Sequence, residues 1–314
     1  MAGADTAVAV VCDTTAYLPR DLVAAEGLNL VSLYVNWADG SERESEMASF
    51  DAFYERLRSS EQLPTTSQPS IGDFLAVYEP LIRQGKEIVS IHISGGLSGT
   101  VESARQAQEQ LAERGMGERV TVVDSESACG GLGLVAVAAA RAAKRGADRS
   151  DVVELAMEVR SSLKMWFAVD TLEYLRRGGR IGAASAWLGT ALKIKPILTV
   201  ESEITPIERV RTGARALRRL ADYAEQRQND GADLWVVQHI QAPEEADQLV
   251  LETEKIMGHP PLWISEIGPV IGTHIGPGLL GIGGVASRLF ERDSSNGEAL
   301  AGTADPGARP AGVG

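Results

Sequence analysis

Apolar, β-branched runs alternate with segments of helical spacing through the first half of the chain. The runs typical of strands are Val8–Cys12, Leu30–Val35, Glu87–Ile93 and Val120–Val123. The segments with helical spacing are 50–59, 71–84, 100–114 and 130–145. Strands and helices that alternate in this way indicate a parallel sheet with helices on both of its faces.

Capping residues support these boundaries. Ser49 and Ser70 stand where the N-caps of two of the helices are expected. Glycines follow the ends of three helices, at Gly85, Gly115 and Gly146.

The second half of the chain has a different pattern. After a helix near 151–163, strand-like segments follow one another closely, and only 213–228 and 243–256 have clear amphipathic helical spacing. The strand-like segments are "MWFAVD", "IKPILTVES", "ITPIERVRT", "LWVVQHI" and "LWISEIGPVIGTHIGPG". This order predicts a second α/β domain with a mixed or antiparallel sheet.

The change of pattern predicts three parts. We expect an N-terminal α/β domain over residues 1–163 and a C-terminal α/β domain over residues 164–287. Residues 288–314 are rich in Gly, Ala, Pro and polar side chains, so we expect a disordered tail there.

Composition narrows the class of protein. The chain has 314 residues, 44% hydrophobic and 23% charged, which is typical of a globular protein. Its net charge of −13 repels nucleic acid and anionic lipid head groups. Two cysteines, Cys12 and Cys129, are too few for a disulfide framework or a thiolate metal site. With no basic start before the first apolar residues and no apolar run of membrane-spanning length, we expect a cytoplasmic protein without a membrane span.

The segment "IHISGGLSGT", residues 91–100, joins an apolar strand to the start of a helix. Its glycines allow a tight turn, and the first amides of the helix, with the Ser98 and Thr100 hydroxyls, would suit an anion. The alternative is that Ser98 or Thr100 only caps the helix. A second hydroxyl cluster, Pro64–Ser70, also precedes a helix, and ordinary loop chemistry would equally explain it. Because ligands gather at the carboxyl ends of parallel strands, both loops are candidates for one site.

A histidine among glycines forms a third candidate. We expect His274, in "GTHIGPG", at the end of a strand of the second domain. A lone histidine is more often structural, but its neighbours here have little bulk to bury it, and glycines let a ligand approach closely.

A series of short motifs lies along the chain, and the resemblance that they carry extends over about residues 7–286. They are "CDTTAYLP", "TTSQPS", "SGGLSGT", "VVDSESACGGLG", "LEYLRRGGRI", "LKIKPIL" and "GTHIGPGLLG". Together they resemble the DegV family of bacterial proteins. The resemblance implies a two-domain α/β fold of the EDD type that holds one long-chain fatty acid in an internal tunnel. It also implies a carrier without a cofactor, which presents the carboxylate to a separate fatty acid kinase for acyl phosphate formation.

The resemblance also assigns the ligand site. The carboxylate-binding hydroxyls fall on Thr66 and Ser98, and His274 falls on a position of indirect contact. The other ligand-binding positions in these motifs are Ser67, Gly96 and Leu97.

Basic residues gather in one region of this acidic chain, at Arg176, Arg177, Arg180, Lys193 and Lys195. Cations suit the C-terminal end of a helix, so the group could be a solvated helix end. The alternative is a docking surface for a phosphate-carrying partner. The resemblance implies that the three arginines face the kinase.

Two other functions compete with a carrier. Ser98 and His274 could be the nucleophile and base of a hydrolase, but a Gly-x-Ser-x-Gly elbow would need glycine at position 100, where Thr100 stands. A regulatory protein that senses lipid would use the same pocket without a kinase. The sequence has neither a phosphate-binding P-loop nor zinc-ligand spacing.

Overall fold

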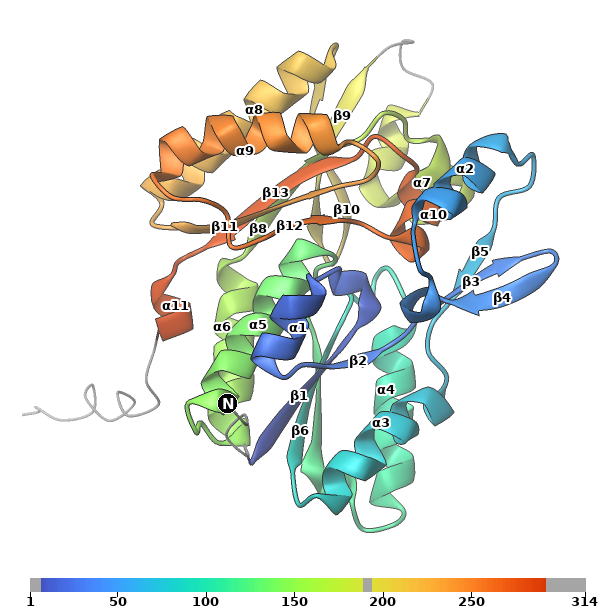
Figure 1. Ribbon diagram of the computed structural model, residues 1–314, viewed down its shortest axis with the longest axis vertical. Coiled ribbons are helices and arrows are strands. Elements are labelled where there is room, and N and C mark those ends of the chain that lie inside the picture. Colours follow the sequence, from blue (N-terminus) through green and yellow to red (C-terminus); the bar gives the residue numbers. More distant parts are fainter. Residues whose placement is uncertain (1–6, 189–193, 292–314) are drawn as a thin grey trace, which may run out of the picture.

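The computed structural model describes residues 7–188 and 194–291 and has the expected α/β fold (Figure 1). The first sheet is fully parallel, with the order β2 (Asn29–Val31), β1 (Val8–Asp13), β6 (Glu87–His92), β7 (Val120–Asp124). Every residue of β1 is buried, because side chains that alternate along the strand meet helices on both faces. The parallel sheet predicted from the apolar runs is confirmed.

Two pairs of helices enclose this sheet. On one face, α5 (Gly130–Lys144) and α6 (Arg149–Ser162) pack on Val8, Val10 and Cys12. On the other, α3 (Ile71–Arg83) and α4 (Thr100–Ala112) pack on Ala9 and Val11. Figure 1 shows the two pairs on opposite sides of β1 and β6. The short helix α1 (Arg20–Glu26) lies against α5.

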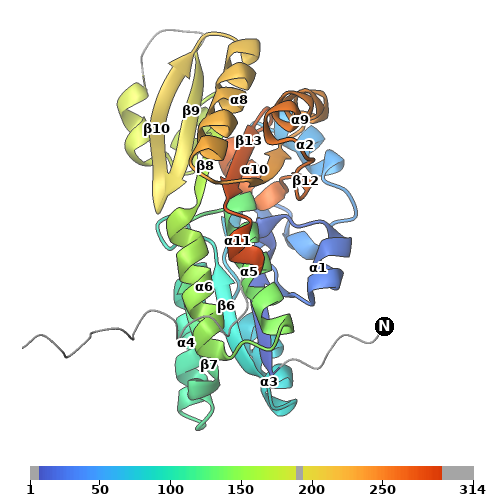
Figure 2. The same ribbon diagram turned by 90° about the vertical axis from the view of Figure 1, so that its left-hand side faces the viewer.

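The second sheet is mixed. Its order is β10 (Glu203–Val210), β9 (Lys195–Glu201), β8 (Lys164–Ala168), β13 (Leu280–Val285), β11 (Leu234–His239), β12 (Ile264–Glu266). All neighbours are antiparallel except β11 and β12. Helices α8 (Gly213–Asn229) and α9 (Pro243–Met257) pack side by side on one face of this sheet, and Figure 2 shows them next to each other.

A small third sheet links the two larger ones. It consists of β4 (Gly40–Arg43), β3 (Tyr34–Trp37) and β5 (Thr65–Ser67), and its β3–β4 hairpin extends from the body of the molecule (Figure 1). Helix α2 (Asp51–Ser59) follows this hairpin. The remaining described elements are η1 (Thr14–Ala16), η2 (Glu44–Glu46), η3 (Gly117–Arg119), α7 (Glu173–Arg177), η4 (Gly182–Trp187), α10 (Pro269–Ile275) and α11 (Arg288–Glu291).

The segment around this small sheet belongs to the first half of the chain but packs on the second. Val35, Phe53 and Tyr54 share an apolar cluster with Phe167 and Leu279. The division at residue 163 therefore stays a prediction, because a large core spans residues from both sides of it.

Several local predictions differ from the structure. The single strand expected over Leu30–Val35 is two strands in different sheets, β2 and β3. The chain leaves the parallel sheet between them, where the Leu33 amide donates to Thr14 Oγ1 at 3.3 Å. Ser70 does cap α3, with a capping box to Asp73, whereas the N-cap of α2 is Phe50 rather than Ser49. Gly85, Gly115 and Gly146 follow helix ends with positive φ, as predicted.

The first four residues of the expected disordered tail are helical. Arg288–Glu291 form α11, because Leu289 and Phe290 are buried against the first core. Residues 292–314 of the expected tail lie outside the described residues.

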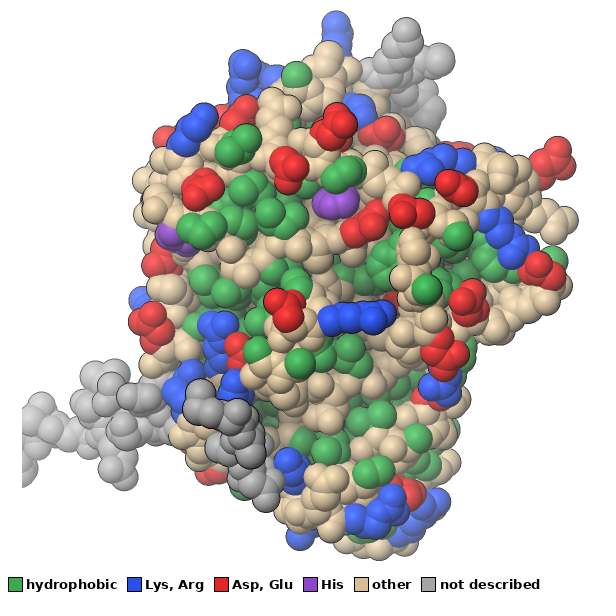
Figure 3. Space-filling model, viewed as in Figure 1, with side chains coloured by type: hydrophobic (Ala, Val, Ile, Leu, Met, Phe, Trp, Pro, Cys, Tyr) green, Lys and Arg blue, Asp and Glu red, His purple; other side chains and the backbone are tan. Residues whose placement is uncertain are grey.

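Charged and apolar side chains mix over the molecular face drawn in Figure 3. Of the helices in residues 7–188 and 194–291, none has both the length and the apolar composition needed to cross a bilayer. Within the same ranges, no group of histidine, cysteine and carboxylate side chains could hold a metal ion.

Leu132→Ala should lower the free energy of unfolding by about 2–5 kcal/mol. Leu132 is fully buried in α5, so its truncation leaves a cavity in the first core. Urea denaturation measures the loss. Leu251→Ala is the matched control, since Leu251 is 60% exposed and its truncation should cost less than about 0.5 kcal/mol. Equal losses in the two variants would contradict this packing.

Candidate functional site

Three segments that lie far apart in the sequence meet at one pocket. Thr66 comes from β5, Leu97 and Ser98 from the loop between β6 and α4, and His274 from the last turn of α10. Thr66 Oγ1 and His274 Nε2 are 2.7 Å apart, at hydrogen-bond distance. The two hydroxyl loops and the histidine singled out from the sequence are therefore brought together.

His274 lies in a helix, where a strand end was expected. Pro269 at the first turn starts α10, and Gly276, at φ 78°, ends it. Gly276 also leaves room for the Tyr174 ring, which would lie 2.3 Å from a β-carbon there. The segment is too short for helical periodicity to show, so its proline and glycine were the available signals.

His274 is held in its neutral form. Burial lowers its pKa to about 4, and the nearby Arg180 cation acts in the same direction. Its Nδ1 is buried without a hydrogen-bond partner among the described residues. A neutral ring has one donor and one acceptor nitrogen. If Nε2 carries the proton and donates to Thr66 Oγ1, the hydroxyl proton of Thr66 is left to donate to a ligand.

Ser98 occupies a tight turn just before α4. The amides of Leu97 and Ser98 donate to the Ser94 carbonyl at 3.0 and 3.1 Å. Ser98 Oγ lies 2.8 Å from Thr100 Oγ1 and accepts a hydrogen bond from the Thr100 amide at 3.3 Å. The N-cap of α4 is Gly99, so Ser98 is bonded within its turn and also faces the pocket.

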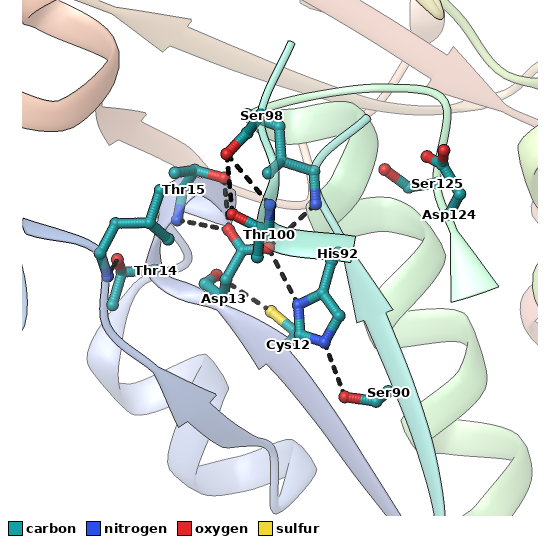
Figure 4. Close-up of polar contacts among 12 residues, drawn as sticks. Cys12, Asp13, Thr14, Thr15, Ser90, His92, Ser98, Thr100, Asp124 and Ser125 are labelled. Atoms are coloured by element: carbon teal, nitrogen blue, oxygen red, sulfur yellow. Dashed lines mark hydrogen bonds and ion pairs between the residues drawn. The ribbon is translucent and has the colours of Figure 1, made fainter. Parts of the chain in front are cut away.

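Buried polar groups fix the strand ends beneath this loop (Figure 4). Asp13 Oδ2 accepts from the Ile93 amide at 2.9 Å and lies 3.1 Å from His92 Nδ1. Asp13 Oδ1 accepts from the amide of Thr15 at 3.1 Å, and His92 Nε2 lies 2.6 Å from Ser90 Oγ. These contacts tie the carboxyl ends of β1 and β6 together and so position the loop that carries Ser98.

The basic residues divide between two environments. Arg180 lines the pocket, donating from Nε to the Leu97 carbonyl at 3.2 Å and from Nη1 to the Gly178 carbonyl at 2.8 Å. Arg176 and Arg177 are exposed and pair with Glu173 at 2.6 and 2.7 Å. The other two cations are Lys195, which pairs with Asp170, and Lys193, which lies outside the described residues.

Two of the expected ligand-binding positions face elsewhere. Of the described residues, those that line the pocket include Thr66, Leu97, Ser98 and His274, but not Ser67 or Gly96. Ser67 Oγ accepts from Asn36 Nδ2 at 3.1 Å. A β-carbon on Gly96 would lie 2.5 Å from the Ser202 carbonyl oxygen, so this glycine allows the loop to approach the β9–β10 turn.

Apolar side chains line the rest of the pocket. They come from both halves of the chain. They are Leu33, Ile93, Leu97, Ala128, Met165, Phe167, Leu175, Val200, Ile204, Ile267, Val270, Ile271, Ile275 and Leu279. Apart from Leu97, sequence reasoning missed this apolar lining, because its residues belong to segments that any core would contain. It also missed Gln68, Cys129 and Gln238, which line the same pocket.

The protein is thus an α/β protein with two large sheets, a small third sheet and an apolar pocket that has hydroxyl groups at one end. The chain matches the model of the "Uncharacterised protein, DegV family" over residues 7–287. It is 35% identical over 280 residues to Protein DegV of Bacillus subtilis, covering 88% of this chain and 98% of that one. A DegV domain-containing protein of Streptomyces coelicolor is 38% identical over 278 residues, covering 88% and 97%. The chain therefore belongs to the DegV family.

Solved structures show the same fold. Bacillus subtilis DegV, described as a fatty acid binding protein, superposes with a TM-score of 0.80 at 34% identity, covering 90% of this chain and 100% of that one. A DegV family protein of Thermus thermophilus, described for its fatty acid binding, gives a TM-score of 0.80 at 33% identity, covering 89% and 99%.

Gly178→Ala should displace the His274 ring, because the new β-carbon would lie 2.3 Å from Nδ1. The displaced ring would lose Thr66 and gain solvent, so its pKa should rise from about 4 toward the ordinary 6.5. A titration of the imidazole resonances by NMR measures this. Gly213→Ala is the control, since a β-carbon there would meet no atom within 4 Å. An unchanged His274 pKa in Gly178→Ala would contradict the geometry.

Proposed function

We propose that this protein is a fatty acid carrier that holds one long-chain fatty acid, with its carboxylate at Thr66 and Ser98 and its acyl chain along the apolar lining. The observation that carries the proposal is a pocket with a polar end and an apolar body. At the polar end, Thr66 Oγ1 lies 2.7 Å from Nε2 of the partly buried, neutral His274. The fatty acid binding described for the relatives from Bacillus subtilis and Thermus thermophilus supports it.

The energetics suit an amphiphile. Each methylene that leaves water contributes roughly 0.8 kcal/mol, so the apolar lining would supply most of the affinity. A buried carboxylate costs several kcal/mol unless hydrogen bonds replace its water. The Thr66 and Ser98 hydroxyls can both donate to it, and the Arg180 cation lines the same pocket. His274 would act through Thr66, by orienting the hydroxyl.

The geometry favours binding over covalent catalysis by Ser98. A hydrolase needs the nucleophilic hydroxyl bonded to its base. Here Ser98 Oγ lies against Thr100 Oγ1, whereas His274 Nε2 lies against Thr66 Oγ1. Ser98 therefore has no activating contact with the histidine in this arrangement.

Thr66→Val should weaken palmitate binding by about tenfold, because it removes one hydrogen bond to the carboxylate and keeps the side-chain shape. Calorimetric titration of delipidated protein measures the dissociation constant, and native mass spectrometry of untreated protein would identify a bound acid by mass. Thr121→Val, on β7, is the control and should bind like the parent. Parent protein that binds no fatty acid, or a Thr66→Val variant that binds as tightly as the parent, would refute the head-group assignment.

We further propose that the bound acid is presented to a separate fatty acid kinase, in the cytoplasm, and that the kinase docks over α7. The exposed Arg176 and Arg177 beside the pocket residue Arg180 support this surface. The competing function is lipid sensing without a kinase. The two differ in whether acyl phosphate forms when the loaded protein, a kinase and ATP are mixed.

The double variant Arg176→Ala/Arg177→Ala should bind palmitate normally and slow acyl phosphate formation at least about tenfold, because it removes two exposed cations outside the pocket lining. Coupled turnover measured against kinase concentration separates docking from chemistry. Arg83→Ala, another exposed arginine paired with a glutamate, on α3, is the control. Equal loss of palmitate binding and turnover would contradict docking, and absence of turnover in the parent with every kinase tested would favour sensing.

A further inference from the structure

The buried carboxylate of Glu44 lies where the first and second halves of the chain meet. Glu44 stands in η2 and is 3% exposed. Its Oε1 accepts hydrogen bonds from the Tyr17 hydroxyl at 2.7 Å and the Val270 amide at 2.8 Å. Its Oε2 accepts from the Thr14 hydroxyl at 2.8 Å. A side chain from the start of the chain thus binds the first turn of α10.

The first turn of α10 depends on such distant partners. The N-cap, Gly268, supplies no side-chain hydrogen bond within the described part of the chain. The first amides of a helix need acceptors from elsewhere. The Val270 amide donates to the Glu44 carboxylate, and the Ile271 amide donates to the Tyr17 hydroxyl at 3.1 Å. Preceding carbonyls are held as well, since the Tyr54 hydroxyl donates to the Ile267 carbonyl at 2.7 Å.

His274 follows Val270 by four residues, one turn further along the same face of α10. A change at Val270 therefore reaches His274 through one turn of a short helix. We propose that Glu44 is a positioning residue for the ligand site, setting the place of α10 and through it the contact between His274 and Thr66. The inference rests on the proposed fatty acid binding and adds a residue that does not touch the ligand pocket.

Keeping Glu44 ionised opposes folding. Burial raises its pKa to about 7, and the Asp13 carboxylate adds to the rise, while the bonds from Val270, Tyr17 and Thr14 oppose it. An acid with a raised pKa in the folded state lowers the free energy of unfolding as the pH rises, here from about 4.5 to about 7. Ionised Glu44 therefore lowers the free energy of unfolding, so a contribution to stability does not explain why this position holds a carboxylate. Its energetic cost points instead to a role in the ligand site.

Solvent protons can reach the surroundings of this carboxylate. A second cleft, which we call the Glu44 cleft, contains Glu44 with Asp13, Tyr17, Arg20 and Glu266 in its lining. Asp13 and Tyr17 interact electrostatically with Glu44, and so do Tyr54 and Cys129, which lie outside this lining. Protonation would remove the negative charge, so the hydrogen bonds from Val270, Tyr17 and Thr14 would lose their charge assistance and weaken. The hold on α10 would weaken as the pH falls through the pKa of Glu44.

The experiment measures how fast a fluorescent palmitate analogue leaves the protein for phosphatidylcholine vesicles, between about pH 6 and about pH 8. In the parent, dissociation should accelerate as the pH falls, with a midpoint near pH 7. Glu44→Gln should dissociate about tenfold faster at the upper pH, with a flat profile, because no charge remains to titrate. Its urea midpoint at the upper pH should not fall, since a buried charge has been removed.

Two further variants make the result decisive. Tyr17→Phe removes one donor to Glu44, and because that bond lowers the pKa, the pH midpoint should move upward. Glu26→Gln, at a buried carboxylate that pairs with Arg141 and Lys144, should behave like the parent in dissociation. The positioning role would be overturned if the analogue left Glu44→Gln at the parent's rate and with the parent's pH profile. It would also be overturned if the urea midpoint of Glu44→Gln fell enough to account for the faster dissociation. Failure of the parent to bind the analogue would instead overturn the proposed function.

Discussion

The hydrogen bond between Thr66 and His274 joins two residues 208 positions apart, and the arrangement of the pocket depends on it. It can form only if β5, the last strand of the small sheet, lies against α10 from near the end of the chain. His274 must also be largely shielded from water, since this desolvation keeps its ring neutral by lowering its pKa to about 4. Gly178 then has to be a glycine, because any β-carbon there would meet the ring. One contact thus constrains the positions of three separate segments.

The rest of the structure supplies what this contact needs. The parallel sheet, enclosed by four helices, brings the loop with Ser98 to the edge that faces the second sheet, and the Asp13 contacts fix the strand ends beneath it (Figure 4). Glu44, Tyr17 and Tyr54 hold the other end of α10. Apolar residues from both halves of the chain line the pocket between these polar groups. The pocket therefore forms only when the two halves are packed together.

Sequence patterns predicted the elements whose periodicity is long enough to measure. The buried strands β1 and β6 and the capped helix α3 are examples, and the motifs with Thr66, Ser98 and His274 indicated the polar end of the pocket. Helix α10 was missed because its seven residues hold mixed small and apolar side chains, and its first turn is fixed by hydrogen bonds from residues more than 200 positions away. Arg180 was grouped with Arg176 and Arg177 as a docking residue. All three are exposed, but Arg180 also lines the pocket, which sequence spacing does not reveal. The apolar lining could not be predicted, because a residue that lines a cavity has the same composition as one that fills a core.

The most direct test is a high-resolution crystal structure of the protein with palmitate. Hydroxyls of Thr66 and Ser98 should both lie within hydrogen-bond distance of the carboxylate, His274 should contact Thr66 rather than the ligand, and the alkyl chain should run over Phe167 and Met165. A carboxylate bound outside this polar end, or an alkyl chain on the outer surface with the apolar lining closed, would contradict the account.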